Sequence, residues 1–152
     1  MSQDNVQKVR RFFEATERSL EQWPRPSRSL EDAVRAGDLP PATREALAYL
    51  SPEFEWSPIF SGETYRGFIE LARGWDELIE ATESYALELI DADDLGGDRV
   101  FVVFGPTLEG RSSGINVDAA VFAVVTLRDG LIVRMEEYTD RRAALEAAGR
   151  SE

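Results

Sequence analysis

The groups in this sequence that could transfer protons are carboxylates and tyrosines, because the chain contains no histidine and no cysteine. This composition excludes cysteine nucleophiles, disulfides, imidazole or thiolate metal sites, and every catalytic triad that uses histidine. The single lysine, Lys8, falls on an expected surface helix, so Schiff-base chemistry is not predicted. No acidic run of the Asp-x-Asp-x-Asp-Gly kind suggests a metal site. Proton transfer would therefore fall to Asp, Glu or Tyr, with arginine as electrostatic partner. The sequence predicts no metal or cofactor and leaves open whether the protein is an enzyme.

Candidate residues for this chemistry lie on the strand expected after Asp129-Gly130, a pair typical of two-residue hairpin turns. With these two residues as the loop, Val121 is expected opposite Tyr138, and Ala119 opposite Asp140. Because side chains alternate along a strand, one face of the return strand is expected to carry Ile132, Arg134, Glu136, Tyr138 and Asp140. Polar groups on a central strand must be paired or must line a cavity. This face therefore makes Val121, Glu136 and Tyr138 candidate pocket residues.

The polar residues of this strand also have purely structural interpretations. Asp140 precedes a helical segment, so it could simply cap that helix. Tyr138 and Glu136 could form a cross-strand pair with a neighbour. Arg134 could be a solvated charge near the hairpin tip, and the sequence leaves these alternatives open.

Three aromatic residues outside this strand are further candidates: Trp56, Tyr65 and Trp75. They could wall an apolar ligand cavity. Aromatic residues at such spacing also serve as ordinary core. Both interpretations stay open from the sequence.

The chain is expected to form one domain over residues 1–152, since this length suffices for a sizeable core and no linker or repeat divides it. Its formal net charge of −12 argues against nucleic acid, whose phosphates need a basic patch, and against anionic membranes. No apolar run approaches the roughly 20 residues that span a bilayer. Charges begin at Asp4, so no secretory signal is visible, and we expect a cytoplasmic protein.

The elements that must position the candidate residues follow the order helices, strand, helix, then four strands. Periodicity and capping signals predict helices near 6–23, 29–37, 41–50, 68–82 and 141–149, and strands near 53–57, 85–89, 100–104, 115–128 and 131–140. This order favours an α+β fold, with N-terminal helices packed in the concave face of a strongly curved antiparallel sheet around a cone-shaped cavity. The convex face would stay apolar through Phe122 and Val124, and a second copy would cover it most simply.

Short motifs along the chain point to one family: Glu55-Trp56, Tyr65-Arg66-Gly67, Ser113-Gly114, Leu127–Arg134, Glu137–Asp140 and Ala144–Gly149. In these motifs the chain resembles the SnoaL-like branch of the NTF2-like superfamily, over Val6 to Gly149. The resemblance implies a cone-shaped α+β barrel, usually a homodimer, with a pocket between helices and sheet. The superfamily hosts isomerases, hydrolases, cyclases and proteins that only bind or dimerise, so the fold does not define a reaction.

The ketosteroid isomerases of this superfamily use an Asp just before the proline that follows the first strand. Here Ser57 stands before Pro58. Their tyrosine on the first helix matches Phe12 or Phe13, which cannot donate a hydrogen bond. The isomerase mechanism is therefore not expected in that form.

The limonene-epoxide hydrolases use an Arg-x-Asp pair on one strand and a second Asp at the end of the last strand. The nearest match to the pair is Arg99-Val100-Phe101, in which Phe101 replaces the Asp. Asp140 matches the final position and also resembles the acid–base Asp of the polyketide cyclases. The resemblance thus implies Asp140 as the acid–base residue. Tyr138 is our own candidate for its orienting partner.

Two functions are consistent with these observations. In the first, the protein binds a small, largely apolar molecule between Trp56, Tyr65 and Trp75, with cyclase- or isomerase-type acid–base chemistry. In the second, it is a non-catalytic ligand-binding or dimerisation domain. A homodimer through the convex sheet face is expected in either case.

Overall fold

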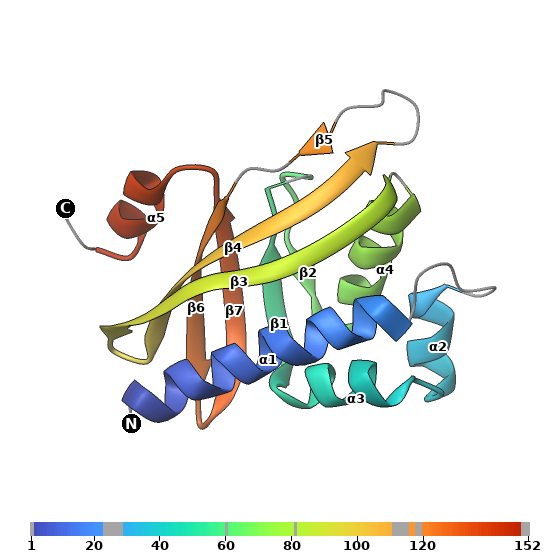
Figure 1. Ribbon diagram of the computed structural model, residues 1–152. Helices are drawn as coiled ribbons and strands as arrows, with labels where there is room; N and C mark the ends of the chain where they lie inside the picture. The colour runs from blue at the N-terminus through green and yellow to red at the C-terminus, as the bar shows by residue number, and fades with distance from the viewer. Residues whose placement is uncertain are drawn as a thin grey trace.

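The structure is a computed structural model, and it describes residues 2–22, 29–59, 61–80, 82–110, 116–117 and 120–149. In these ranges helices pack against one curved sheet (Figure 1). The helices are α1 (Ser2–Gln22), α2 (Leu30–Ala36), α3 (Pro41–Ala48), α4 (Gly67–Glu80) and α5 (Arg141–Ala147). The strands are β1 (Leu50–Ser57), β2 (Tyr65–Arg66), β3 (Thr82–Gly96), β4 (Arg99–Gly110), β5 (Asn116–Val117), β6 (Val121–Arg128) and β7 (Leu131–Tyr138). The predicted α+β architecture is confirmed.

Local signals begin and end α2, and begin α3, as predicted. The Ser29 hydroxyl accepts a hydrogen bond from the Asp32 backbone N–H, and Gly37 ends α2 at a positive φ of 69°. Pro41 opens α3, where its missing N–H costs no intrahelical hydrogen bond. Helix α3 packs against α1 and helix α2 against α4, and Figure 1 shows α2 beside the C-terminal end of α1.

The described strands form an open sheet in the order β2-β1-β7-β6-β4-β3, with β5 paired to β4. All neighbours are antiparallel except β1 and β7, which run parallel. The sequence predicted an antiparallel sheet, and the β1–β7 pair is the one parallel exception among the described strands. After β1 the chain passes through α4, β3, β4 and β6, and it returns beside β1 in the same direction.

The hairpin between β6 and β7 turns at Asp129 and Gly130 as predicted, with φ angles of 54° and 81°. The predicted register beyond the turn was wrong. Leu127 pairs with Ile132 but Thr126 pairs with Arg134, so Val133 is one extra residue in β7. This β-bulge shifts the pairing by one, and Tyr138 lies opposite Phe122 instead of Val121. Ala119, the predicted partner of Asp140, lies outside the described residues.

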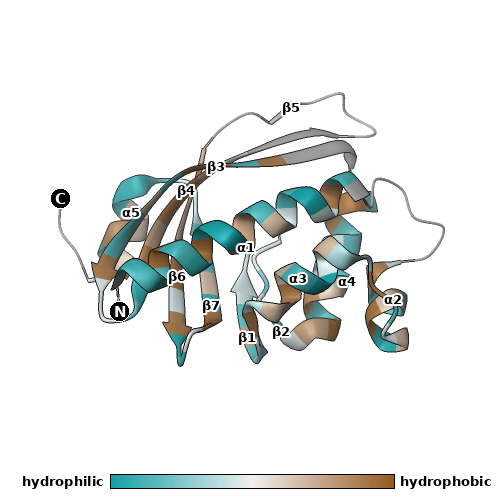
Figure 2. Ribbon diagram, turned by 60° about the horizontal axis from the view of Figure 1, so that its bottom comes forward, coloured by the Kyte–Doolittle hydropathy of each residue, from teal (hydrophilic) through white to brown (hydrophobic). Residues whose placement is uncertain are grey.

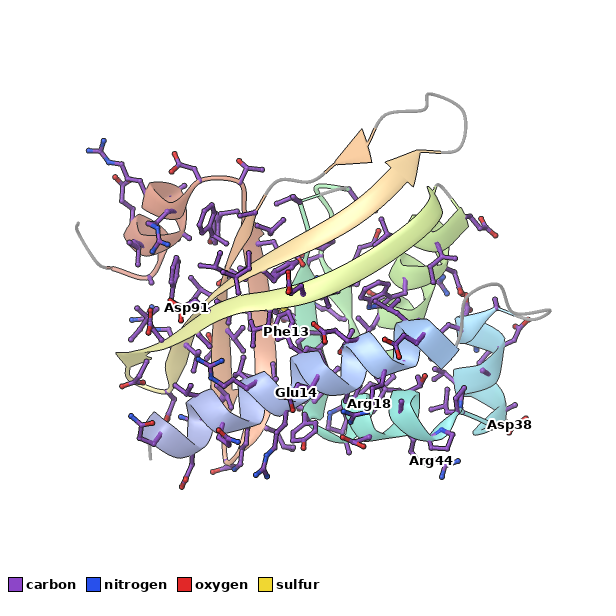
Figure 3. All side chains as sticks on the ribbon, in the orientation of Figure 1. Phe13, Glu14, Arg18, Asp38, Arg44 and Asp91 are labelled. Atoms are coloured by element: carbon purple, nitrogen blue, oxygen red, sulfur yellow. The ribbon has the colours of Figure 1, made fainter. Side chains whose placement is uncertain are left out.

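The main core lies between α1, α4 and the concave face of the sheet. Val9 and Phe13 of α1 are buried there against sheet residues such as Phe104 and Val125. Figure 3 shows Phe13 pointing from α1 toward the sheet. In Figure 2, hydrophobic colours gather on the central strands and hydrophilic ones on the outer side of α1. Helix α1 therefore follows the amphipathic pattern expected of a helix on a sheet.

The convex face carries a second, smaller core beneath α5. Leu95, Phe101, Val103 and Val124 are buried there against Ala144 and Ala148. The Arg141 guanidinium lies 5.2 Å from the ring centre of Phe101 and 5.4 Å from that of Phe122. The sequence predicted that a second copy would cover the apolar convex face, but over this region the chain's own last helix covers it.

Candidate functional site

A cavity of about 90 Å³ lies between the helices and the concave face of the sheet. Four helices and four strands contribute to its walls. Its lining is Phe12, Phe13, Thr16, Ser19, Leu20, Leu30, Val34, Thr43, Ala46, Leu47, Leu50, Phe54, Trp56, Phe68, Leu71, Ala72, Trp75, Ile79, Leu87, Phe104, Met135 and Glu137. Among these lining residues, Glu137 is the one with an ionisable side chain. A mostly apolar cavity with a few polar groups is the usual form of a small-molecule site.

Glu137 lies on β7 and presents its carboxylate on the concave side. The Trp56 indole Nε1–H donates to its Oε2 at 2.9 Å, and the Ile59 backbone N–H donates to its Oε1 at 3.2 Å. Burial raises the pKa of the Glu137 carboxyl, and these two hydrogen bonds oppose the rise. Because a carboxylate offers about four lone-pair sites, a ligand hydroxyl or amine could still donate to it. Such a carboxyl can hold or accept a proton inside an apolar cavity.

Stacked aromatic rings position the carboxylate. Trp56 of β1 stacks on Trp75 of α4, with ring centres 5.6 Å apart and planes at 17°. Tyr65 of β2 packs on Trp56, with ring centres 5.6 Å apart, and its hydroxyl donates to Glu77 at 2.8 Å. The group approaches α4 closely at Gly74, where an added Cβ would lie 3.0 Å from the Trp56 ring. The indole that donates to Glu137 therefore has little freedom to move.

Two hydroxyl groups form a second polar point on the helical wall. Ser19 of α1 and Thr43 of α3 are hydrogen-bonded to each other, and Thr43 is only 5% exposed. The nearby Thr16 hydroxyl donates to the Phe12 carbonyl of its own helix at 2.8 Å. The cavity thus has one acidic group on the sheet side and one hydroxyl pair on the helical side.

Helix α2 forms a further wall through Leu30 and Val34. Its first turn is held from α4, because the Asp76 carboxylate accepts hydrogen bonds from the backbone N–H groups of Leu30 at 2.8 Å and Glu31 at 3.0 Å. Arg73 of α4 also reaches the Glu31 carboxylate. This arrangement fixes α2 against α4.

The structure places two of the predicted aromatic residues, Trp56 and Trp75, in the cavity wall. Tyr65 lies behind Trp56, buried to 6% exposure, and is not in the lining. Val121 is buried in the main core and pairs with Phe104, also outside the lining.

Three of the predicted residues on β7 and beyond lie away from the cavity. Glu136 faces the convex side opposite Val124, and Tyr138 packs in the cluster beneath α5. Burial, followed by the charge of Glu136, raises the pKa of the Tyr138 hydroxyl. Asp140 is exposed and caps α5, its carboxylate accepting from the Arg142 backbone N–H at 2.8 Å. This hydrogen bond supports the interpretation of Asp140 as a helix cap, and its acid–base role stays a prediction.

Sequence reasoning missed Glu137 because the bulge at Val133 reverses the alternation in β7. Regular alternation from the turn groups Glu136 with the buried Ile132. With the extra residue, Ile132, Met135 and Glu137 share the concave face instead. Both faces of the strand carry apolar residues, so the sequence held no clear sign of the bulge.

Within the described ranges, no group of three or more acidic side chains is arranged to hold a metal ion. None of the helices in the same part of the chain is long and apolar enough to cross a membrane. Among the described lining residues, the polar side chains are therefore Glu137 and the hydroxyl residues Thr16, Ser19 and Thr43.

Helices seated in the concave side of a curved, open sheet, around an apolar cavity, define the class of NTF2-like α+β proteins. Within this class the chain belongs to the SnoaL-like domain family, whose sequence pattern matches residues 27–135. A comparison with curated proteins finds no match.

Solved structures share the fold at low sequence identity. An NTF2-like protein of unknown function from Burkholderia pseudomallei is 19% identical, with a TM-score of 0.63 and 92% of each chain covered. A candidate SnoaL-like polyketide cyclase from Jannaschia sp. CCS1 is 24% identical, with a TM-score of 0.59, covering 97% of this chain and 92% of the other. TerC, co-crystallised with polyporic acid, is 21% identical, with a TM-score of 0.56, covering 76% and 88%. At these identities the likeness extends to the fold alone.

Proposed function

We propose that the protein binds a small, mostly apolar molecule in the cavity and that Glu137 accepts a hydrogen bond from a hydroxyl or similar group of that molecule. The observation that carries this proposal is the Glu137 carboxylate, held by Trp56 and Ile59, as the one ionisable side chain among the described lining residues, which are mostly apolar. Burying a carboxylate is costly unless it is hydrogen-bonded. A ligand that donates to its remaining lone pairs offsets part of this cost.

The related structures support a small organic ligand. TerC was co-crystallised with polyporic acid, and the Jannaschia protein is a candidate polyketide cyclase. Flat aromatic molecules suit a cavity whose wall includes the stacked rings of Trp56 and Trp75.

A second candidate function is acid–base catalysis of the cyclase or isomerase type. The raised pKa of Glu137 favours it, because a carboxyl whose pKa is higher than usual exchanges protons with carbon acids more effectively near neutrality. In this proposal Glu137 removes a proton from the bound molecule and returns it at another position. Asp140 with Tyr138 stays an alternative acid–base pair, to be tested alongside.

The test for binding is a thermal-shift screen of aromatic phenols and ketones with the wild type and two variants, Glu137→Gln and Glu136→Gln. A ligand at a hundred times its dissociation constant should add about 2.7 kcal/mol to the free energy of unfolding. Phenols should lose affinity in Glu137→Gln and keep it in Glu136→Gln, whose side chain faces the convex side. Equal affinity in all three proteins, or no shift with any compound, would overturn the proposal.

Catalysis is tested with the compounds that bind. Proton exchange with deuterated solvent, followed by NMR on the bound ketones, should slow at least a hundredfold in Glu137→Gln if that residue is the base. An Asp140→Asn variant should exchange at the wild-type rate. The reverse pattern would assign the role of catalytic base to Asp140. If the wild type shows no exchange, the protein binds these compounds without catalysing proton transfer.

A further inference from the structure

We propose that the hydrogen-bonded hydroxyls of Ser19 and Thr43 form a second binding subsite, which donates a hydrogen bond to a carbonyl or ether oxygen of the ligand. This inference rests on the proposed function, because it concerns the same cavity. It narrows the ligand to an aromatic molecule with two polar groups, a donor that faces Glu137 and an oxygen acceptor that faces the helices.

The hydrogen count of the pair provides the first argument. Each hydroxyl has one hydrogen to donate and two lone pairs to accept. The single bond between Ser19 and Thr43 uses one of the two hydrogens. Within the described residues, neither hydroxyl makes another hydrogen bond. One of the two hydroxyl hydrogens is therefore left to donate. Since both residues line the cavity, this hydrogen can point into the cavity.

The surroundings of the pair provide the second argument. Neighbouring lining residues on the same helices, such as Leu20, Ala46 and Leu47, are apolar. The Thr16 hydroxyl already donates within α1. A water molecule needs two to four polar partners to be held in a cavity, and this wall offers it little beyond the pair. A ligand oxygen needs only the one donor, since the rest of the ligand packs on the apolar wall.

The position of the pair provides the third argument. Ser19 and Thr43 belong to α1 and α3, whereas Glu137 belongs to β7. The two polar points thus lie on different layers around the apolar space. The exposed ion pair between Arg18 and Glu45 joins the same two helices on the outside, and Figure 3 shows Arg18 between α1 and α3. The hydroxyl pair therefore lies on the cavity side of the contact between these helices.

The experiment measures dissociation constants for three matched bicyclic probes. Hydroxytetralone, with its phenol meta to the carbonyl, has both polar groups. Tetrahydronaphthol has the phenol without the ketone, and tetralone has the ketone without the phenol. The proteins are the wild type, the double variant Ser19→Ala with Thr43→Val, and Thr16→Val as a matched control that removes an already satisfied hydroxyl from the same wall.

We expect the wild type to bind hydroxytetralone about fivefold more tightly than tetrahydronaphthol, the effect of one ordinary hydrogen bond. In the double variant this preference should fall to about one, and in Thr16→Val it should stay near fivefold. Replacing both hydroxyls together leaves no unpaired partner, so the variant should fold. A Thr43→Ser variant, which keeps the hydroxyl, should retain the preference and guards against a packing effect.

The inference is overturned if the ketone preference survives in the double variant, falls equally in Thr16→Val, or is absent in the wild type. The preference for hydroxytetralone over tetralone reports on Glu137 separately. Suppose that Glu137→Gln abolishes the preference for hydroxytetralone over tetralone, and that the double variant keeps the preference for hydroxytetralone over tetrahydronaphthol. The proposed function then stands and the second subsite does not. If none of the probes binds, both proposals fail.

Discussion

Glu137 is expected to make the stability of the protein depend on pH in a direction opposite to that of a salt-bridged carboxylate. Burial raises its pKa in the folded state above the usual 4.5. The folded chain then binds the proton more tightly than the unfolded chain, so this contribution to stability is full below about pH 4.5 and is lost as the pH rises through the raised pKa. Relative to Glu137→Gln, the wild type should therefore lose unfolding free energy over this window.

The measurement is urea unfolding of both proteins from pH 4 to about pH 8, with Glu55→Gln for comparison. Hydrogen bonding to Arg66, with further support from Arg134, lowers the pKa of Glu55. Its contribution is present above the usual 4.5 and is lost as the pH falls through the lowered pKa, so the sign is reversed. Parallel pH profiles for the wild type and Glu137→Gln would contradict the burial of the Glu137 carboxyl.

Asp140 offers a second prediction at the scale of one side chain. Its carboxylate caps α5 through the Arg142 backbone N–H. Asp140→Ala should lower the free energy of unfolding by about 1 kcal/mol, and Asp140→Ser should restore most of it because serine also caps. Urea unfolding measures both. A loss of ligand affinity in Asp140→Ser, without a loss of stability, would indicate a pocket role instead of a cap.

The sequence could predict the kind of residue in the site but not which glutamate provides it. The absence of histidine and cysteine left carboxylates as the acid–base groups, and the lining contains one. Choosing Glu136 instead of Glu137 followed from regular alternation in the strand. One bulged residue, Val133, reversed that choice, and a bulge depends on how two strands pair, which local sequence does not specify.

At the scale of elements, the position of α2 is expected to depend on Asp76. Its carboxylate accepts from two N–H groups of the first turn of α2, which would otherwise lack partners. Asp76→Ala should raise amide hydrogen exchange in Leu30–Ala36 about tenfold, whereas Asp76→Asn should retain part of the protection. Arg73→Ala, which removes only a surface ion pair with Glu31, should have a much smaller effect. Unchanged exchange in Asp76→Ala would show that packing alone holds α2.

The packing of α4 on β1 and β2 gives another prediction, at Gly74. In a helix interior, Gly→Ala normally stabilises by about 1 kcal/mol. Here the added Cβ would lie 3.0 Å from the Trp56 ring and 3.2 Å from that of Tyr65. Trp56 is held by its stack on Trp75 and its bond to Glu137, so it cannot easily retreat. Overpacking costs about 1–3 kcal/mol, and Gly74→Ala should therefore be destabilising overall in urea, with changed tryptophan fluorescence. A more stable variant would show that the rings can shift.

Helix boundaries were predictable where the signal is local, and not where it comes from another element. The Ser29 cap and the Gly37 end of α2 follow from the residues themselves. The hydrogen bond from Leu30 of the same helix to Asp76, 46 residues away in sequence, cannot be predicted from local residues. Likewise, Gly74 has no special backbone angle in a helix, and only the tertiary contact with Trp56 shows why a side chain is excluded there.

For the whole molecule, the order of elements was enough to predict helices in a curved sheet, but not how the far face of that sheet is covered. The apolar residues Phe122 and Val124 were expected to face a second copy. The structure places α5 over them, with Arg141 across the ring of Phe101. Seven residues of helix therefore cover part of the surface on which the homodimer prediction was based.

The homodimer remains a prediction, and charged side chains of both signs lie on the convex face where β1 and β7 pair. Arg134 there is half exposed, at 51%, and Glu55 binds both Arg134 and Arg66. A two-fold interface must be complementary to itself, and neighbouring charges of both signs satisfy this by pairing across the axis. Such a dimer should weaken with salt, since exposed ion pairs are screened.

Sedimentation of the wild type and Arg134→Glu at micromolar concentration tests this prediction, in low and in high salt. We expect a wild-type dimer in low salt, partial dissociation in high salt, and a monomer for Arg134→Glu, which places like charges together near the axis. Lys8→Glu, a change of the same charge on α1, is the control and should leave the dimer intact. A wild-type monomer in low salt would exclude the dimer, and a dimer indifferent to salt and to Arg134→Glu would place the interface elsewhere on the molecule.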